Sequence, residues 1–164
     1  MFRWQRSQTN MWTQTDSDWA GDVRTRKSTS GGSVRLGMHL VKSWAKDQAS
    51  IATSSGEAEL YSANKGIMES YGIQGILKDF GMSLGIHLEV DAKATVGMIS
   101  RQGVGEMKHV DVQELWLQEH LKKGRFVLAK IPRLLNTADM MASPSKPEDL
   151  AKNMVSLWFE YPAK

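Results

Sequence analysis

The stretch SVRLGMHLVKSWAKDQ, residues 33–48, decides the fold class, because apolar and polar residues alternate along it. The apolar residues that share one face of its first half are Val34, Leu36, Met38 and Leu40. This period of two predicts a strand over 33–40. The alternation continues over 41–48, around Trp44, and predicts a second strand antiparallel to the first.

A third strand is predicted ahead of this pair. Residues 11–15 alternate weakly and end at Asp16, after a polar segment at 1–10 that we expect to be flexible. The polar residues that follow indicate a loop, and Gly31-Gly32 is expected to be a turn. Three successive strands predict an antiparallel meander on one side of a sheet.

The periodicity then changes from that of a strand to that of a helix. Ser54 or Ser55 can cap a helix, with Glu57 as a capping-box partner, and helical spacing continues to Gly81. The elements expected next are a strand at 86–90, helices at 92–101 and 112–123, a strand at 125–131 and a helical segment capped by Asn136 or Thr137. Together they predict an α/β domain over 11–160. Its mixed five-stranded sheet would have three antiparallel strands, then two parallel ones, with helices on both faces.

Composition excludes several functional classes. The chain has 164 residues, 41% of them hydrophobic, which is enough for one domain with a core. It has no cysteine, so disulfide frameworks and cysteine-based zinc sites are excluded. No run approaches the roughly 18 apolar residues of a membrane span, and residues 1–10 lack the apolar run of a secretion signal. We therefore expect no membrane association and an intracellular location, cytoplasmic or nuclear.

The net charge of +3 is spread unevenly. One basic group consists of Arg24, Arg26, Lys27, Arg35, Lys42 and Lys46. A second consists of Lys108, Lys122, Lys123, Arg125, Lys130 and Arg133. A polyanionic partner such as nucleic acid would explain both groups, whereas isolated charges are more often a solvated surface.

Four acidic residues lie at the ends or first turns of predicted elements: Asp16, Glu59, Asp91 and Asp139. If the first and fourth strands are parallel neighbours, Asp16 and Asp91 reach one edge of the sheet, and the long helix can bring Glu59 over it. Singly, each acid could be an ordinary turn or helix N-terminal residue. Together they could hold two divalent ions with hard oxygen ligands. Their joint placement favours an enzyme acting on a phosphodiester backbone.

Several short motifs resemble one family. They are DSDWAGD at 16–22, TRKSTSGG at 25–32, SWAKDQ at 43–48, SSGEAEL at 54–60, KHVDV at 108–112 and NTAD at 136–139. In this order, over nearly the whole domain, they resemble the ribonuclease H domain of copia-type LTR retrotransposon polyproteins, within the type 1 ribonuclease H superfamily.

The resemblance implies a hydrolase, an endonuclease that cleaves the RNA strand of RNA–DNA hybrids and leaves 5′-phosphate and 3′-hydroxyl ends. Asp16, Glu59, Asp91 and Asp139 match the family's catalytic acids, with Glu57 as the alternative to Glu59. They would bind two Mg²⁺ ions, for which Mn²⁺ often substitutes. In reverse transcription the domain would follow a reverse transcriptase domain of the same polyprotein. We expect the chain alone to be a monomer.

Five residues are candidate substrate contacts. Selectivity for RNA would come from 2′-hydroxyl contacts in the minor groove, for which Ser17, Ser55 and Asn136 are candidates. His109, beside Lys108, could contact the substrate backbone, or could equally cap or pack against the third helix.

The sequence departs from the wider family in two places. Residues 131–135, IPRLL, lack the loop histidine that cellular type 1 enzymes have before the last acid, so proton transfer to the leaving group would use water or another residue. Residues 140–144, MMASP, stand where the family usually has a Thr-Lys pair soon after the last acid.

This second departure motivates an alternative function, a catalytically inactive nucleic-acid-binding module derived from a retroelement. A third hypothesis, an integrase-type polynucleotidyl transferase, fits less well because the helix carrying Glu59 lies between the third and fourth strands.

Overall fold

The computed structural model describes residues 4–101, 103, 111–144 and 147–157. In chain order the elements are β1 (Asn10–Asp18), β2 (Thr29–Leu36), β3 (His39–Asp47), α1 (Ser55–Asp79), β4 (Gly85–Val90), α2 (Lys93–Ser100), α3 (Asp111–Lys122), β5 (Val127–Lys130), the 3₁₀ turn η1 (Arg133–Leu135), α4 (Asp139–Ala142) and α5 (Pro147–Ser156). The predicted order of strands and helices is confirmed.

The five strands form one mixed sheet in the order β3-β2-β1-β4-β5. β1 pairs antiparallel with β2 and parallel with β4, so the antiparallel and parallel halves of the sheet meet at this central strand. β2–β3 is antiparallel and β4–β5 is parallel. This is the predicted fold class.

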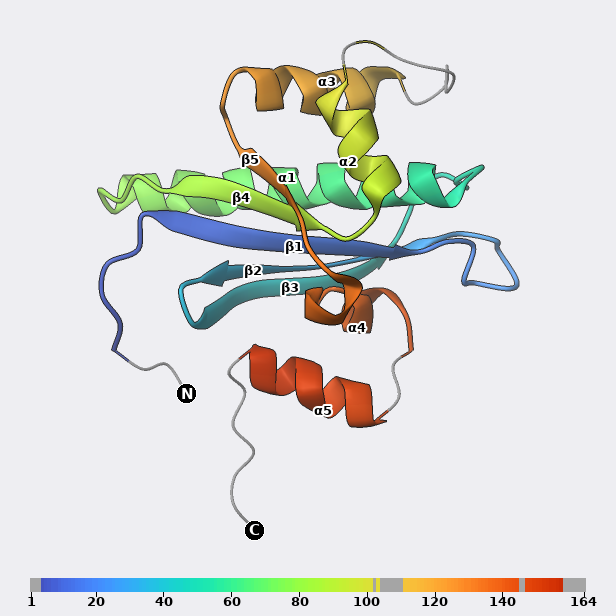
Figure 1. Ribbon diagram of the computed structural model, residues 1–164, viewed down its shortest axis with the longest axis horizontal. Coiled ribbons are helices and arrows are strands. Elements are labelled where there is room, and N and C mark those ends of the chain that lie inside the picture. Colours follow the sequence, from blue (N-terminus) through green and yellow to red (C-terminus); the bar gives the residue numbers. More distant parts are fainter. Residues whose placement is uncertain (1–3, 102, 104–110, 145–146, 158–164) are drawn as a thin grey trace.

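Helices cover both faces of the sheet (Figure 1). α1 crosses one face, with α2 and α3 beyond it, while α4 lies on the other face against β1, β2 and β3. The close approach of α1 depends on Gly66, where a Cβ atom would lie 2.4 Å from Thr15 Cγ2. The core between α1, α2, α3 and the sheet includes Leu60, Ile67, Ile86, Leu88, Ile99 and Leu117. No helix in the described part of the chain has the length and apolar character needed to cross a membrane.

The predicted turn at Gly31-Gly32 is wrong. Both glycines lie inside β2, and the chain turns into β3 at Gly37, whose φ of +60° favours glycine. A Cβ atom on Gly32 would lie 2.1 Å from a ring carbon of Trp44, and one on Gly31 would lie 2.4 Å from the backbone nitrogen of Ala142. These glycines therefore allow close packing on a strand, which is the other common role of strand glycine.

Two predicted boundaries also move. β1 extends to Asp18, so Asp16 lies inside the strand and not just after it. The last helical segment begins only at Asp139, after the 3₁₀ turn η1, and consists of α4 and α5; no side chain of Asn136 or Thr137 caps α4.

Candidate active site

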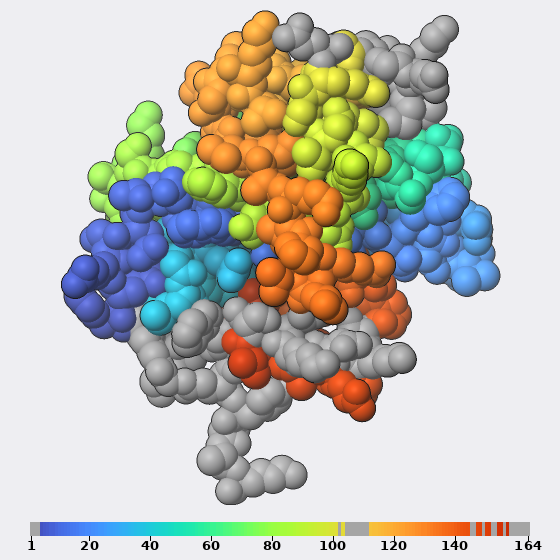
Figure 2. Space-filling model, viewed as in Figure 1, coloured from blue at the N-terminus to red at the C-terminus, as the bar shows by residue number. Residues whose placement is uncertain are grey.

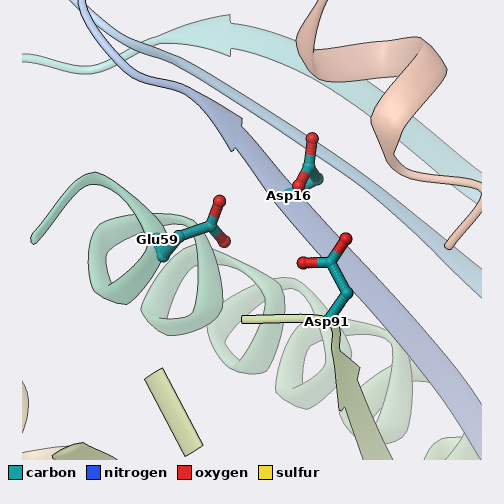
Figure 3. A group of neighbouring side chains, drawn as sticks. All are labelled: Asp16, Glu59 and Asp91. Atoms are coloured by element: carbon teal, nitrogen blue, oxygen red, sulfur yellow. The ribbon is translucent and has the colours of Figure 1, made fainter. Parts of the chain in front are cut away.

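Three of the four predicted acids meet at one end of the sheet. Asp16 of β1, Glu59 of α1 and Asp91, just after β4, point toward one another (Figure 3). One carboxylate oxygen from each lies within 4.8 Å of the others. The parallel register of β1 and β4, with Gln14 opposite Glu89, brings Asp16 and Asp91 to the same end of the two strands.

Burial and mutual repulsion act on the protonation of this acid cluster. Asp16 is 7% exposed and Glu59 is 9% exposed. Burial, and then the charges of Asp91 and Asp139, raise the pKa of Asp16 to about 7. Burial, and then the charge of Asp16, raise the pKa of Glu59 to about 8. Without a cation, burial and repulsion therefore favour the protonated forms of Asp16 and Glu59 near neutral pH.

Glu59 is fixed through one carboxylate oxygen and leaves the other free. The backbone N–H and the hydroxyl of Ser17 donate to Glu59 Oε1, at 3.2 and 3.0 Å. Glu59 Oε2 is buried and has no hydrogen-bond partner within the described structure. A buried carboxylate oxygen without a donor is costly unless a cation meets it. This oxygen and the all-carboxylate ligand set fit a hard divalent cation such as Mg²⁺.

Glu57, the alternative to Glu59, is buried and engaged elsewhere. Its Oε2 accepts hydrogen bonds from the backbone N–H and the hydroxyl of Thr53, both at 2.7 Å. Its Oε1 accepts a hydrogen bond from the Tyr61 hydroxyl at 2.7 Å. With its backbone N–H donating to Ser54 Oγ, Glu57 stabilises the start of α1. The geometry therefore places Glu59, and not Glu57, in the acid cluster.

Asp139 lies beside the cluster but is not one of the three acids whose ligand atoms meet. Its charge contributes to the raised pKa of Asp16. Asp139 Oδ1 accepts a hydrogen bond from Arg133 Nη2 at 2.9 Å. The fourth predicted acid is thus paired with a cation of the protein itself.

A buried polar connection holds Asp139 next to β1. Asn136 Nδ2 donates to the carbonyl of Thr15 at 3.0 Å, and its Oδ1 accepts from the backbone N–H of Ala138 at 3.2 Å. The backbone N–H of Thr137 donates to Gln14 Oε1 at 2.9 Å. The NTAD motif therefore anchors the start of α4 to the strand that carries Asp16, a role that was not predicted.

The candidate substrate contacts have different surroundings. Asn136 is 1% exposed, and both the nitrogen and the oxygen of its side-chain amide form hydrogen bonds within the protein. Ser17 holds Glu59, while Ser55 is exposed at the start of α1. Lys108 and His109 lie outside the described residues. All five remain predictions as substrate contacts.

Gly31→Ala should destabilise the chain by about 1–3 kcal/mol, the usual cost of overpacking. The added Cβ atom would lie 2.4 Å from the nitrogen of Ala142 and 2.7 Å from the carbonyl oxygen of Ala138, and backbone cannot rotate away. α4 would have to shift, and Asp139 with it. Urea unfolding measures the loss. Gly72→Ala is the control, because its Cβ atom would meet nothing within 4 Å and alanine favours a helix. Equal stability of Gly31→Ala and the wild type would contradict this packing of α4.

Sequence comparison gives distant relatives. No protein-family model matches the chain. It is 26% identical over 147 residues to the retrovirus-related Pol polyprotein from transposon TNT 1-94 of Nicotiana tabacum, a match that covers 87% of this chain and 11% of that protein. It is 28% identical over 134 residues to the corresponding polyprotein from transposon RE2 of Arabidopsis thaliana, covering 79% and 9%. The chain thus spans about a tenth of the length of these curated relatives.

Structure comparison decides the fold family. LC11-RNase H1, isolated from compost by a metagenomic approach, matches with a TM-score of 0.62 and 13% identity, over 89% of this chain and 99% of that one. The chain has the ribonuclease H fold. RNase H1 from the archaeon Halobacterium salinarum matches with a TM-score of 0.60 and 16% identity, over 81% and 94%. LC11-RNase H1 in complex with an RNA/DNA hybrid matches with a TM-score of 0.55 and 16% identity, over 80% and 93%.

Sequence relatives and fold agree with each other. The homologues are retrovirus-related Pol polyproteins of transposons, and the structural neighbours are ribonuclease H domains. The resemblance to the ribonuclease H domain of retrotransposon polyproteins, predicted from the motifs, is confirmed.

Proposed function

We propose that the chain is a metal-dependent ribonuclease H that hydrolyses the RNA strand of RNA–DNA hybrids, leaving 5′-phosphate and 3′-hydroxyl ends. The observation that carries this proposal is the meeting of Asp16, Glu59 and Asp91, with ligand oxygens within 4.8 Å of one another. The fold supports it but is not sufficient, because one fold can host many functions.

The proposed mechanism uses two metal ions. Asp16, Glu59 and Asp91 would hold them, with Asp139 as a fourth ligand and Mg²⁺ or Mn²⁺ as the metal. When bound, such ions activate a water molecule and stabilise the leaving 3′-oxygen. The chain itself supplies fixed ligands: Ser17 orients Glu59, and the β1–β4 pairing sets Asp16 relative to Asp91.

The loop between β1 and β2 supports a nucleic-acid substrate. It leaves β1 two residues after Asp16 and presents the exposed side chains of Arg24 and Arg26. Figure 2 shows this blue segment projecting at the right of the molecule. Asp22 stabilises the loop, because its Oδ1 accepts a hydrogen bond from the backbone N–H of Arg24 at 2.8 Å. Trp19 ties the loop to the segment before α1 by donating from Nε1 to the carbonyl of Ala52 at 3.1 Å. Exposed guanidinium groups on a loop that leaves β1 two residues after Asp16 suit contacts with backbone phosphates.

The hybrid as substrate is supported by the neighbour LC11-RNase H1, whose structure in complex with an RNA/DNA hybrid has a similar fold. The polyprotein relatives, of which the chain matches about a tenth, support a place within a longer chain. We propose a reverse transcriptase domain of the same polyprotein as the partner that shares the substrate.

Cleavage of a hybrid labelled on both strands tests the proposal. The purified chain should cut only the RNA strand in Mg²⁺ or Mn²⁺, leave 5′-phosphate ends, and lose activity in EDTA. DNA–DNA and RNA–RNA duplexes of the same sequence are the controls. A folded chain that binds the hybrid but cuts it in neither metal would favour the alternative, an inactive nucleic-acid-binding module.

A further inference from the structure

Arg133 is a cation placed at the edge of the acid cluster. Its Nη2 donates to Asp139 Oδ1 at 2.9 Å. The hydrogen bond to Asp139 and the charge of that carboxylate raise the pKa of Arg133, and Asp16 and Asp91 add to this effect. In turn, the positive charge of Arg133 lowers the pKa of Asp16, against the larger effects of burial and repulsion, which raise it. One guanidinium group therefore pairs with Asp139 and adds positive charge beside Asp16 and Asp91.

The ion pair between Arg133 and Asp139 is easily broken. The side chain of Arg133 is 77% exposed, and that of Asp139 is 27% exposed. The 3₁₀ turn η1 that carries Arg133 is itself exposed, with its neighbour Leu134 92% exposed. An exposed ion pair contributes little to stability, because both charges are well solvated when apart. The guanidinium can therefore leave Asp139 at little cost.

A divalent cation at the cluster would change the balance of charges. It would repel the guanidinium, while the Asp139 carboxylate would exchange one cation for another with a higher charge. The guanidinium would then point into solvent beside the cluster, where a substrate phosphate has to arrive. Guanidinium groups bind phosphate through paired N–H donors.

We propose that Arg133 is an exchangeable counter-ion: it pairs with Asp139 in the metal-free chain, is displaced when a divalent cation binds, and then contacts a backbone phosphate of the nucleic acid. This inference rests on the proposed function, since it requires a metal at the acid cluster. It gives Arg133 a substrate-binding role distinct from that of the acids.

The first measurement is the affinity for Mn²⁺ by titration calorimetry, without nucleic acid. Arg133→Ala should bind Mn²⁺ about twofold to fivefold more tightly than the wild type, the factor expected from removing one exposed competing pair. Arg133→Lys should lie between the two, because it keeps the charge without the planar donors. Lys78→Ala is the control, an exposed cation near the start of β4, whereas the acids lie beyond the end of that strand, and its affinity should not change.

The second measurement is hybrid binding by fluorescence anisotropy in Ca²⁺, over a series of salt concentrations. Arg133→Ala should bind more weakly, and the slope of log affinity against log salt should fall by about 0.7–0.9, the value for one lost phosphate contact. Lys78→Ala is the control, because Lys78 lines a hollow with Gly85 at the start of β4, whereas the acids lie beyond the end of that strand. Its slope should equal that of the wild type.

The outcomes separate this inference from the proposed function. An unchanged or weaker Mn²⁺ affinity of Arg133→Ala overturns the counter-ion role, and an unchanged salt slope overturns the phosphate contact. Neither measurement requires cleavage. A wild-type chain that binds Mn²⁺ without cutting the hybrid would therefore contradict the nuclease alone, and a folded wild-type chain that binds no Mn²⁺ would contradict both.

Discussion

Asp91→Asn should reduce hybrid cleavage by about a hundredfold to a thousandfold or more while the chain stays folded. A metal ion supplies several kcal/mol of transition-state stabilisation, and each 1.4 kcal/mol is a factor of about ten in rate. Asparagine keeps the size of the side chain but removes the charge that a metal would bind. Because the charge of Asp91 contributes to the raised pKa values of Asp16 and Glu59, its removal also relieves repulsion. Stability without metal should therefore hold or rise.

Single-turnover cleavage and urea unfolding in EDTA measure the two effects separately. Asp18→Asn is the matched control, because Asp18 ends β1 two residues after Asp16 but is not among the three acids that meet. It should cut the hybrid at close to the wild-type rate. Wild-type cleavage by Asp91→Asn would remove Asp91 from the metal site, and loss of folding would show that its role is structural.

The acid cluster could largely be predicted from the sequence, because it follows from topology. Parallel pairing of β1 and β4 brings their ends together, and the sequence shows an acid at each end. The choice between Glu57 and Glu59 could not be made from the pattern. Residues two apart on a helix point about 200° away from each other, so only one can face the end of the sheet. The motif resemblance favoured Glu59, and the structure accounts for Glu57 through Thr53 and Tyr61.

The errors in prediction concern contacts between residues far apart in the sequence. The local sequence around Gly31 is the same whether this glycine forms a turn or allows a helix to pack against a strand. The helix that packs against it is α4, more than one hundred residues later in the sequence. The hydrogen bond from Asn136 to the carbonyl of Thr15 could not be predicted either, because the two residues are 121 positions apart in the sequence. The pair between Arg133 and Asp139 is close in the sequence, but its separation of six residues through η1 follows no helical or strand spacing, so the sequence does not indicate it either.

Glu59→Gln should raise the stability of the metal-free chain at pH 8 by on the order of 3 kcal/mol. The pKa of Glu59 is raised from 4.5 to about 8, first by burial and then by Asp16. Between these two values the folded state keeps a proton that the unfolded state has lost. Stability of the wild type should therefore fall as pH rises from about 4.5 to 8. Glutamine is neutral throughout, and its carbonyl oxygen can still accept both hydrogen bonds from Ser17.

Urea unfolding in EDTA at pH 5, 6.5 and 8 measures this slope. In Glu59→Gln most of the decline should disappear, with a smaller one left by Asp16, whose pKa of about 7 ends it near neutrality. Glu69→Gln is the control. The hydrogen bond from Lys42 holds the pKa of Glu69 below its usual value, so that glutamate is charged in both states above pH 5 and its replacement should not change the slope. An equally steep decline in Glu59→Gln would mean that Glu59 titrates normally.

Adding Mn²⁺ at pH 8 extends the same experiment to the metal. A cation that binds the folded chain stabilises it in proportion to its affinity. The wild type should be stabilised more than Glu59→Gln, because the unpartnered Glu59 Oε2 is one of the oxygens a metal would use. Protons and metal ions would thus compete for one carboxylate. Three carboxylate charges so close together, two of them buried, are unfavourable alone, and the same arrangement gives a divalent cation its binding energy.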